Sequence, residues 1–148
     1  MNELHKQCYD KCIQLGILNS DGKPRPYSRS ISTGYMDLCV EPLELFDGLM
    51  FGDDQAFSMA HYFQQNGDLC CDPSMELVVV PRQKIVVPYT FQQSIPPVYE
   101  RVVDTEGKVL NNKLLMLTKF LVLWLNNLIS QGHGSFWQEG ECLKLIHY

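Results

Sequence analysis

The sequence predicts an α+β fold in which an antiparallel meander sheet of about five strands packs against an N-terminal helix and a long C-terminal helix. Apolar residues repeat with a helical period near both ends of the chain, and they alternate with polar residues in the middle. Short turn-forming segments separate the alternating runs, which makes sequential strands antiparallel neighbours. A length of 148 residues is typical of one domain, so we expect a single α+β domain over residues 1–148.

Two segments have the helical period. Residues 2–15 form the predicted N-terminal helix, which Gly16 ends because glycine accepts a left-handed conformation. Apolar residues recur there at steps of three and four: Leu4, Cys8, Cys12 and Leu15. Residues 110–131 form the second helix, which Gly132 ends. Its wide apolar face should lie across the sheet through Leu114, Leu117, Leu121, Trp124, Leu125 and Leu128. We expect residues 137–148 to add a short strand or to pack irregularly.

Five runs have the alternation or the β-forming composition of strands: residues 35–41, 57–63, 75–79, 84–91 and 98–103. A helix competes over the second of these short runs, but its alternation favours a strand. The second and third runs form a predicted hairpin around Asn66 and Gly67. A two-residue loop would place core residues opposite solvent-facing ones, so we expect a bulge or a longer loop near residues 67–72. Pro96 and Pro97 separate the last two runs.

The charge balance argues against duplex nucleic acid as a direct ligand. The chain has a formal net charge of −5 and a pI of about 5.3, so it lacks the positive field that attracts phosphates. Lys23, Arg25 and Arg29 form the main cluster of positive charge, within a Ser-, Gly- and Pro-rich connector over residues 19–32. Three charges neutralise few phosphates, so a solvated loop is the favoured interpretation.

The sequence predicts a cytoplasmic protein without a membrane span. The N-terminal segment is charged and lacks the apolar core of a secretory signal. The longest apolar stretch, residues 114–129, is too short and too interrupted by polar residues to cross a bilayer of about 30 Å. Cysteines in such a chain favour reduced thiols, and no CxxC pair indicates a zinc or redox site. We therefore expect six free thiols: Cys8, Cys12, Cys39, Cys70, Cys71 and Cys142.

Four segments form a recognisable set. They are NGDLCCDPSMEL at residues 66–77, PYTFQQ at 88–93, VYERV at 98–102 and WLNNLISQG at 124–132. In this order they resemble an uncharacterised domain family of bacterial conjugative elements and phages, with a GD and a DP motif, a Gln-rich strand and a helix ending in QG. The resemblance implies no reaction. It implies a mobile-element context, in which small acidic proteins often modulate host systems by binding protein partners.

Asp68, Asp72 and Glu76, together with His61, are the most enzyme-like group. Carboxylates and an imidazole can hold Mg²⁺, Mn²⁺ or Zn²⁺ and activate a water molecule. The structural interpretation is favoured, because Asp after Asn-Gly and Asp before Pro commonly form turns. His61 shares a face with Phe57 and other apolar residues, where a hydrogen-bonded core or edge histidine is commoner than a metal ligand.

Two further groups are weaker candidates. His5, Cys8 and Cys12 share a helical face and could donate metal ligands, but they lie on the apolar stripe and packing is favoured. Cys70 or Cys71 with His61 could form a nucleophile and base, but no third group supports the pair. The sequence contains no GxSxG, HExxH, P-loop or dinucleotide-binding pattern. The sequence therefore favours a protein that is not an enzyme and needs no cofactor.

The leading functional hypothesis is a non-catalytic binding or inhibitor protein of a phage or mobile genetic element. Its partner would be a protein, for instance a host defence protein. The predicted contact residues are apolar residues outside the core pattern: Phe46, Leu49, Met50, Phe51, Trp137 and Tyr148. The alternative is a metal-dependent hydrolase or nuclease that uses Asp68, Asp72, Glu76 and His61.

Overall fold

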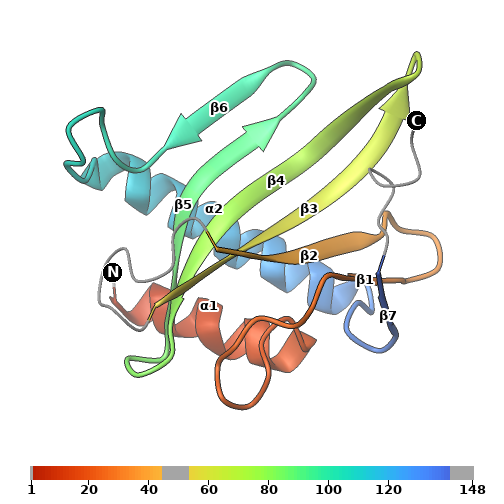
Figure 1. Cartoon of the computed structure of the whole chain (residues 1–148), viewed down its shortest axis with the longest axis horizontal. Coiled ribbons are helices and arrows are strands. Elements are labelled where there is room, and N and C mark those ends of the chain that lie inside the picture. Colours follow the sequence, from red (N-terminus) through yellow and green to blue (C-terminus); the bar gives the residue numbers. More distant parts are fainter. Residues whose placement is uncertain (1, 45–53, 141–148) are drawn as a thin grey trace.

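A computed structural model of the chain describes residues 2–44 and 54–140 (Figure 1). The two helices are α1 (Asn2–Leu15) and α2 (Asn111–Ser130), close to the predicted ranges. The strands are β1 (Ser28–Ser30), β2 (Leu38–Leu43), β3 (Gln55–Gln65), β4 (Asp68–Val80), β5 (Ile85–Gln93), β6 (Val98–Arg101) and β7 (Trp137–Glu139). The predicted α+β class, with both helices in place, is confirmed.

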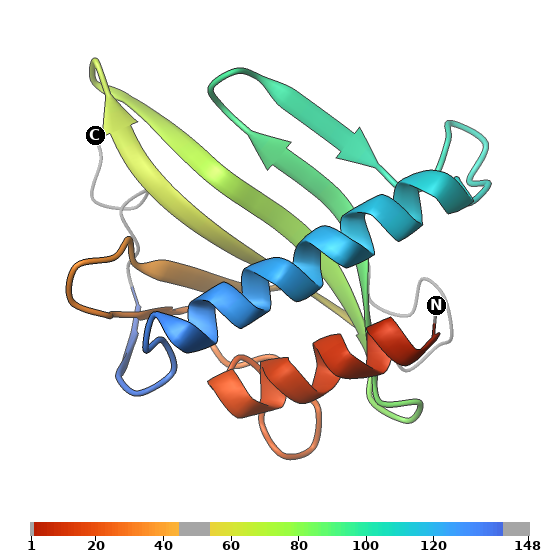
Figure 2. The ribbon, with the colours of Figure 1, turned by 180° about the vertical axis from the view of Figure 1, so that it is seen from behind.

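The strands form one seven-stranded sheet in the order β6-β5-β4-β3-β2-β1-β7, and every pairing in it is antiparallel. Strands β1 to β6 follow one another as a meander, and β7 returns after α2 to pair with β1 (Figure 1). Both helices lie on the same face of the sheet (Figure 2). The five predicted strands correspond to β2 to β6, whereas β1 was missed. The short strand expected after the second helix is β7.

The β3–β4 hairpin has a tight turn and a bulge. Asn66 and Gly67 both have positive φ, 54° and 84°, and Gln65 pairs directly with Asp68, so the loop has two residues. The register then shifts beside His61, between the pairs that β4 forms at Cys71 and at Ser74. The predicted bulge is confirmed at this shift, and it makes a longer loop unnecessary because it returns core residues to the core face.

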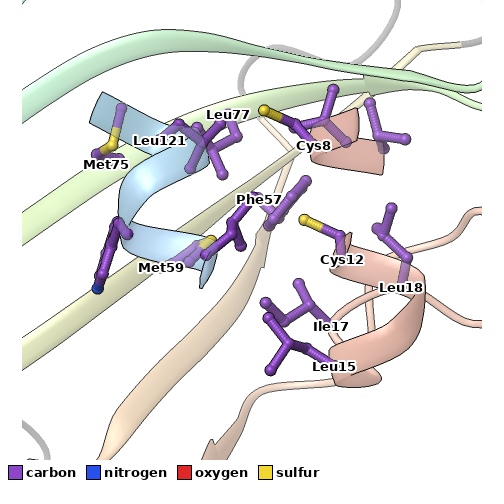
Figure 3. Packing of buried hydrophobic residues seen from close by; sticks show 14 of the residues in the cluster. Cys8, Cys12, Leu15, Ile17, Leu18, Phe57, Met59, Met75, Leu77 and Leu121 are labelled. Carbon is purple, nitrogen blue, oxygen red and sulfur yellow. The ribbon is translucent and has the colours of Figure 1, made fainter. Parts of the chain in front are cut away.

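The core lies between the sheet and the two helices. Helix α2 contributes the buried side chains Leu117, Thr118, Leu121, Trp124, Leu125 and Leu128, and Leu114 is half-buried. The leucines and Trp124 among them form one cluster with Phe57 and Met59 of β3, Leu77 of β4 and residues of α1 (Figure 3). This packing confirms that the second helix lies across the sheet on its leucine face.

Cysteines occur in two states. Cys8 and Cys12 are fully buried in the core (Figure 3), and burial raises the pKa of the Cys8 thiol to about 12. Cys70 and Cys71 are also free and buried. Cys39 is disulfide-bonded, so the prediction of six free thiols is wrong at this position. Sequence spacing could not reveal this bond, because cysteines pair through proximity in the fold.

Helix α2 is long and apolar enough to meet length and composition criteria for a membrane-spanning helix. It is also the central core helix of this domain, and core helices of soluble proteins meet the same criteria. The criteria alone therefore do not identify α2 as a span.

Candidate binding surface

His61 is held inside the domain by two hydrogen bonds. Its Nδ1 lies 2.9 Å from the carbonyl oxygen of Asp37, and the indole N–H of Trp124 donates to its Nε2 at 3.2 Å. Because Nε2 accepts, the ring proton belongs on Nδ1, which donates to the Asp37 carbonyl. Burial lowers the pKa of His61 and favours the neutral ring. The predicted core histidine is confirmed, and neither ring nitrogen is free to bind a metal or to act as a base.

His133 lies next to this group, with its ring centroid 6.2 Å from that of His61. Its Nδ1 is 3.0 Å from Ser30 Oγ, which also accepts the backbone N–H of Gly134 at 3.0 Å. Burial lowers the pKa of His133 as well. Ser30 and His133 thus connect β1 to the segment after α2, and both are buried, with exposed fractions of 0% and 5%. The hydrogen bond between Ser30 and His133 therefore holds these two parts of the fold together.

The four residues of the alternative metal site do not come together. Asp68 lies at the exposed tip of the β3–β4 hairpin, and Glu76 accepts a hydrogen bond from Thr90 Oγ1 at 3.0 Å. Within residues 2–44 and 54–140 no group of three or more His, Cys, Asp or Glu side chains is placed to hold a metal ion. The long hairpin separates Asp68 from Glu76, so the four residues do not form one group.

The turn does not depend on Asp68. No hydrogen bond of its side chain is found with the described residues, and the bend comes from the positive φ angles of Asn66 and Gly67. Among the described residues, no side-chain hydrogen bond of Asp68 supports the turn-forming role that the sequence predicted for it. Asp72 lies on the bulge and lines a cleft with Arg29 and Asp37.

The N-terminal group packs as expected. His5 Nε2 is 3.1 Å from Thr118 Oγ1, so His5 joins α1 to α2, and the thiols of Cys8 and Cys12 are in the core. The Cys71 thiol donates to the Gln92 carbonyl at 3.7 Å. With both nitrogens of His61 engaged, the cysteine–histidine pair has no available base.

Two of the three cations in the basic connector contact other groups of the domain, whereas Lys23 is exposed as predicted for a solvated loop. Arg25 donates to the Gly16 carbonyl at 2.7 Å and lies 4.1 Å from the centre of the Trp137 ring. Arg29 lies on β1 and reaches Asp37 at 3.4 Å and Gln138 at 3.1 Å. Arg29 contacts groups of neighbouring strands because β1 pairs on both sides, which the sequence did not indicate.

Five predicted contact residues, Phe46, Leu49, Met50, Phe51 and Tyr148, lie outside the described residues. Trp137 is half-buried, and its indole N–H donates to the Leu15 carbonyl at 3.1 Å. Its described contacts are therefore internal to the domain. A binding role for these residues stays a prediction.

An apolar groove of about 540 Å³ separates β6 from the N-terminal half of α2. Its lining residues are Phe91, Val98, Glu100, Lys113, Met116, Leu117 and Phe120. Phe91 of β5 and Phe120 of α2 meet edge to face, with ring centroids 5.2 Å apart. Lys113 Nζ lies 2.6 Å from Glu100 Oε2, so an ion pair joins the helix to β6 and neutralises both charges. The groove is thus apolar with little net charge.

Exposed apolar side chains border this groove. Met116 is 50% exposed on the helix side, and Val98 is 36% exposed on β6. Tyr99, which is 58% exposed, follows Val98 on β6 and lies on the opposite face of the strand. Concentrated exposed apolar area of this kind is typical of protein interaction sites. We define Phe91, Val98, Met116 and Phe120 as the groove residues.

Sequence reasoning missed the groove residues, although one signal was present. Helix α2 has more apolar residues than one buried face needs, and Met116 and Leu123 remain 50% and 57% exposed outside the core stripe. A surface helix normally has polar residues at such positions. This excess could have identified α2 as a contact element, but the contribution of β6 depends on the tertiary fold.

The described residues thus define a two-layer α+β domain with an apolar groove between a sheet edge and a helix. Residues 14–134 match the family described as a domain of unknown function (DUF6908), and the chain belongs to this family. The match agrees with the resemblance to an uncharacterised domain family. The link to conjugative elements and phages, and the motif pattern, stay predictions. No curated protein and no solved structure matches the chain.

Proposed function

We propose that the chain is a non-catalytic protein-binding protein that contacts its partner through the groove between β6 and α2. The observation that supports this most is the apolar lining of the groove, with Val98 exposed on the β6 side and Met116 exposed on the helix side. Burying such side chains against a partner removes apolar surface from water, which favours association.

The polar groups of the domain support binding rather than catalysis. His61 and His133 are buried, and their contacts join structural elements of the domain. The groove itself is lined by one ion pair whose members neutralise each other. A protein interface needs this combination of an apolar centre and a few polar groups at its border.

The biological setting of the proposal comes from the sequence resemblance. We place the protein in the cytoplasm of a bacterial host, where a phage or mobile genetic element would use it to inhibit or modulate a host defence protein. Expression in bacterial strains that each carry one defence system would test this part. The plating efficiency of a sensitive phage should rise in at least one strain, and Met116→Glu should abolish the rise.

The binding itself is tested by photo-cross-linking. A photoreactive amino acid replaces Met116 in the groove or, as the matched control, Leu123 on the exposed side of the same helix. Position 116 should cross-link a specific host protein and position 123 should not. With that protein purified, Met116→Glu should weaken binding by about tenfold or more, because it places a carboxylate in an apolar contact, and Leu123→Glu should not. Equal effects of the two variants would contradict the proposal.

A further inference from the structure

Strand β6 is the last strand at one edge of the sheet, and its outer side carries backbone groups that β5 does not use. The Val102 N–H donates to the Tyr89 carbonyl at 3.0 Å, in the same register as the β5–β6 pairs. In an antiparallel ladder, bonded and non-bonded pairs alternate along the strand. Glu100 and Val98 therefore point their backbone groups toward β5. Tyr99 and Arg101 point theirs away from the sheet.

This edge is accessible. The side chains of Val98, Tyr99 and Arg101 are exposed. The chain after β6 folds back only beyond it, where Leu110 N–H donates to the Val102 carbonyl at 2.7 Å and Val103 bridges to Val109. The outward N–H and C=O groups of Tyr99 and Arg101 thus border solvent, next to the groove that Val98 and Glu100 line. Figure 2 shows β6 as the strand farthest from α1, above the N-terminal half of α2.

We propose that β6 binds an extended segment of a protein partner, which adds one strand to the sheet and places alternate apolar side chains in the groove. This inference rests on the proposed function and specifies the partner's conformation. Edge strands are templates for such pairing, in which backbone bonds supply affinity and side-chain pockets supply selectivity. Side chains of an added strand alternate between faces, so every second one would lie over Met116 and Phe120.

The charged residues on the two faces of β6 indicate which side chains the partner segment should carry. Glu100 is neutralised by Lys113 on the helix side, so the groove favours uncharged side chains. On the opposite face Arg101 is exposed, with its guanidinium 3.4 Å from the Tyr89 hydroxyl. A segment with apolar residues at alternate positions and an acidic residue facing Arg101 fits both faces.

A second copy of this chain fits the edge poorly. Two β6 strands related by a two-fold axis would pair antiparallel with the axis at Glu100, Tyr99 or Arg101. An axis at Glu100 places Glu100 opposite Glu100, and an axis at Arg101 places Arg101 opposite Arg101. Both are unfavourable like-charge pairs. An axis at Tyr99 places Arg101 opposite Pro97, which has no N–H to donate. A different protein is therefore the occupant that the edge favours.

The test uses a phage-displayed library of random 12-residue peptides, selected on the full chain, and the most enriched peptide made synthetically. Tyr99→Pro removes an outward N–H and leaves the inner ladder intact, whereas the matched Tyr99→Ala removes the side chain but keeps the N–H. Binding should be weaker in Tyr99→Pro than in Tyr99→Ala by about tenfold, the effect of one lost backbone bond with its partner left unpaired. In the wild type, the amide hydrogens of Tyr99 and Arg101 should exchange more slowly when the peptide is bound.

The outcomes separate this inference from the proposed function. If Met116→Glu weakens peptide binding but Tyr99→Pro and Tyr99→Ala behave alike and the two amides stay unprotected, strand addition is refuted and groove binding stands. If Met116→Glu has no effect while both amides become protected, strand addition stands without the groove. Failure to enrich any peptide refutes strand addition, while the cross-linking result at Met116 decides the proposed function independently. Protection of the same amides by a second copy of the chain alone would refute a different protein as occupant.

Discussion

Replacing Leu121 by alanine tests the packing of α2 on the sheet. Leu121 is fully buried and belongs to the same cluster as Met75 and Leu77 of β4 (Figure 3). A fully buried leucine that becomes alanine costs about 2 to 5 kcal/mol, from lost burial and from the cavity that remains. Since sheet residues and α1 fix the surroundings of Leu121, we expect little collapse and a loss of about 3 to 4 kcal/mol.

The matched control is Leu123→Ala on the same helix, where the side chain is 57% exposed. Both variants change helix propensity equally, so the difference between them isolates burial. The free energy of unfolding of Leu123→Ala should change by less than about 0.5 kcal/mol. Urea denaturation followed by circular dichroism gives both values, and the melting temperature of Leu121→Ala should fall by about 10 °C. Similar losses in both variants would refute the packing described here.

Three other predictions follow from the described contacts. Burial lowers the pKa of His5, His61 and His133 in the folded chain, so the unfolded chain binds more protons below its histidine pKa of about 6.5. The urea midpoint should therefore fall from pH 6.5 toward pH 5.5 and stay level between pH 7 and 8; a midpoint that rises on acidification would contradict this. Gly67→Ala should cost about 1 kcal/mol because φ is +84°, whereas Asp68→Ala should be nearly neutral in the same denaturation assay. In denaturant without reductant, alkylation followed by peptide mass spectrometry should modify Cys8, Cys12, Cys70 and Cys71 but leave Cys39 unmodified until a reductant is added.

The sequence was informative where structure depends on local patterns. The leucine repeat predicted α2, the alternation around Met75 predicted β4, and the mismatch of faces around Asn66 predicted the bulge. It was uninformative where pairing partners are far apart. Strand β1 has only three residues, Ser28–Ser30, and its buried serines have no apolar alternation to detect. It forms because β2 and β7 supply partners on both sides.

The candidate site also depended on contacts between residues far apart in the sequence, which local patterns could not predict. His61 attracted attention as a titratable residue, yet its neighbours Trp124 and Asp37 come from distant segments and use both ring nitrogens. Asp68 and Glu76 are close in sequence but lie far apart along an extended hairpin, in which each residue advances by about 3.3 Å. The four residues of the alternative metal site therefore do not form one group. Closeness in sequence gives closeness in space on a helix or a tight loop, but not along a strand.

Helix α2 connects the stability of the domain to its proposed function. Its inward face places Leu121 and Leu128 in the core. Met116 and Phe120 lie one turn apart on the helix, and both line the groove. Phe120 belongs to both surfaces, since it packs against the core and contacts Phe91 across the groove. Because the core holds α2 rigidly against β5, the groove exists before any partner binds. A preformed groove would spare the proposed complex the entropic cost of ordering these side chains, which favours the binding of a short extended segment.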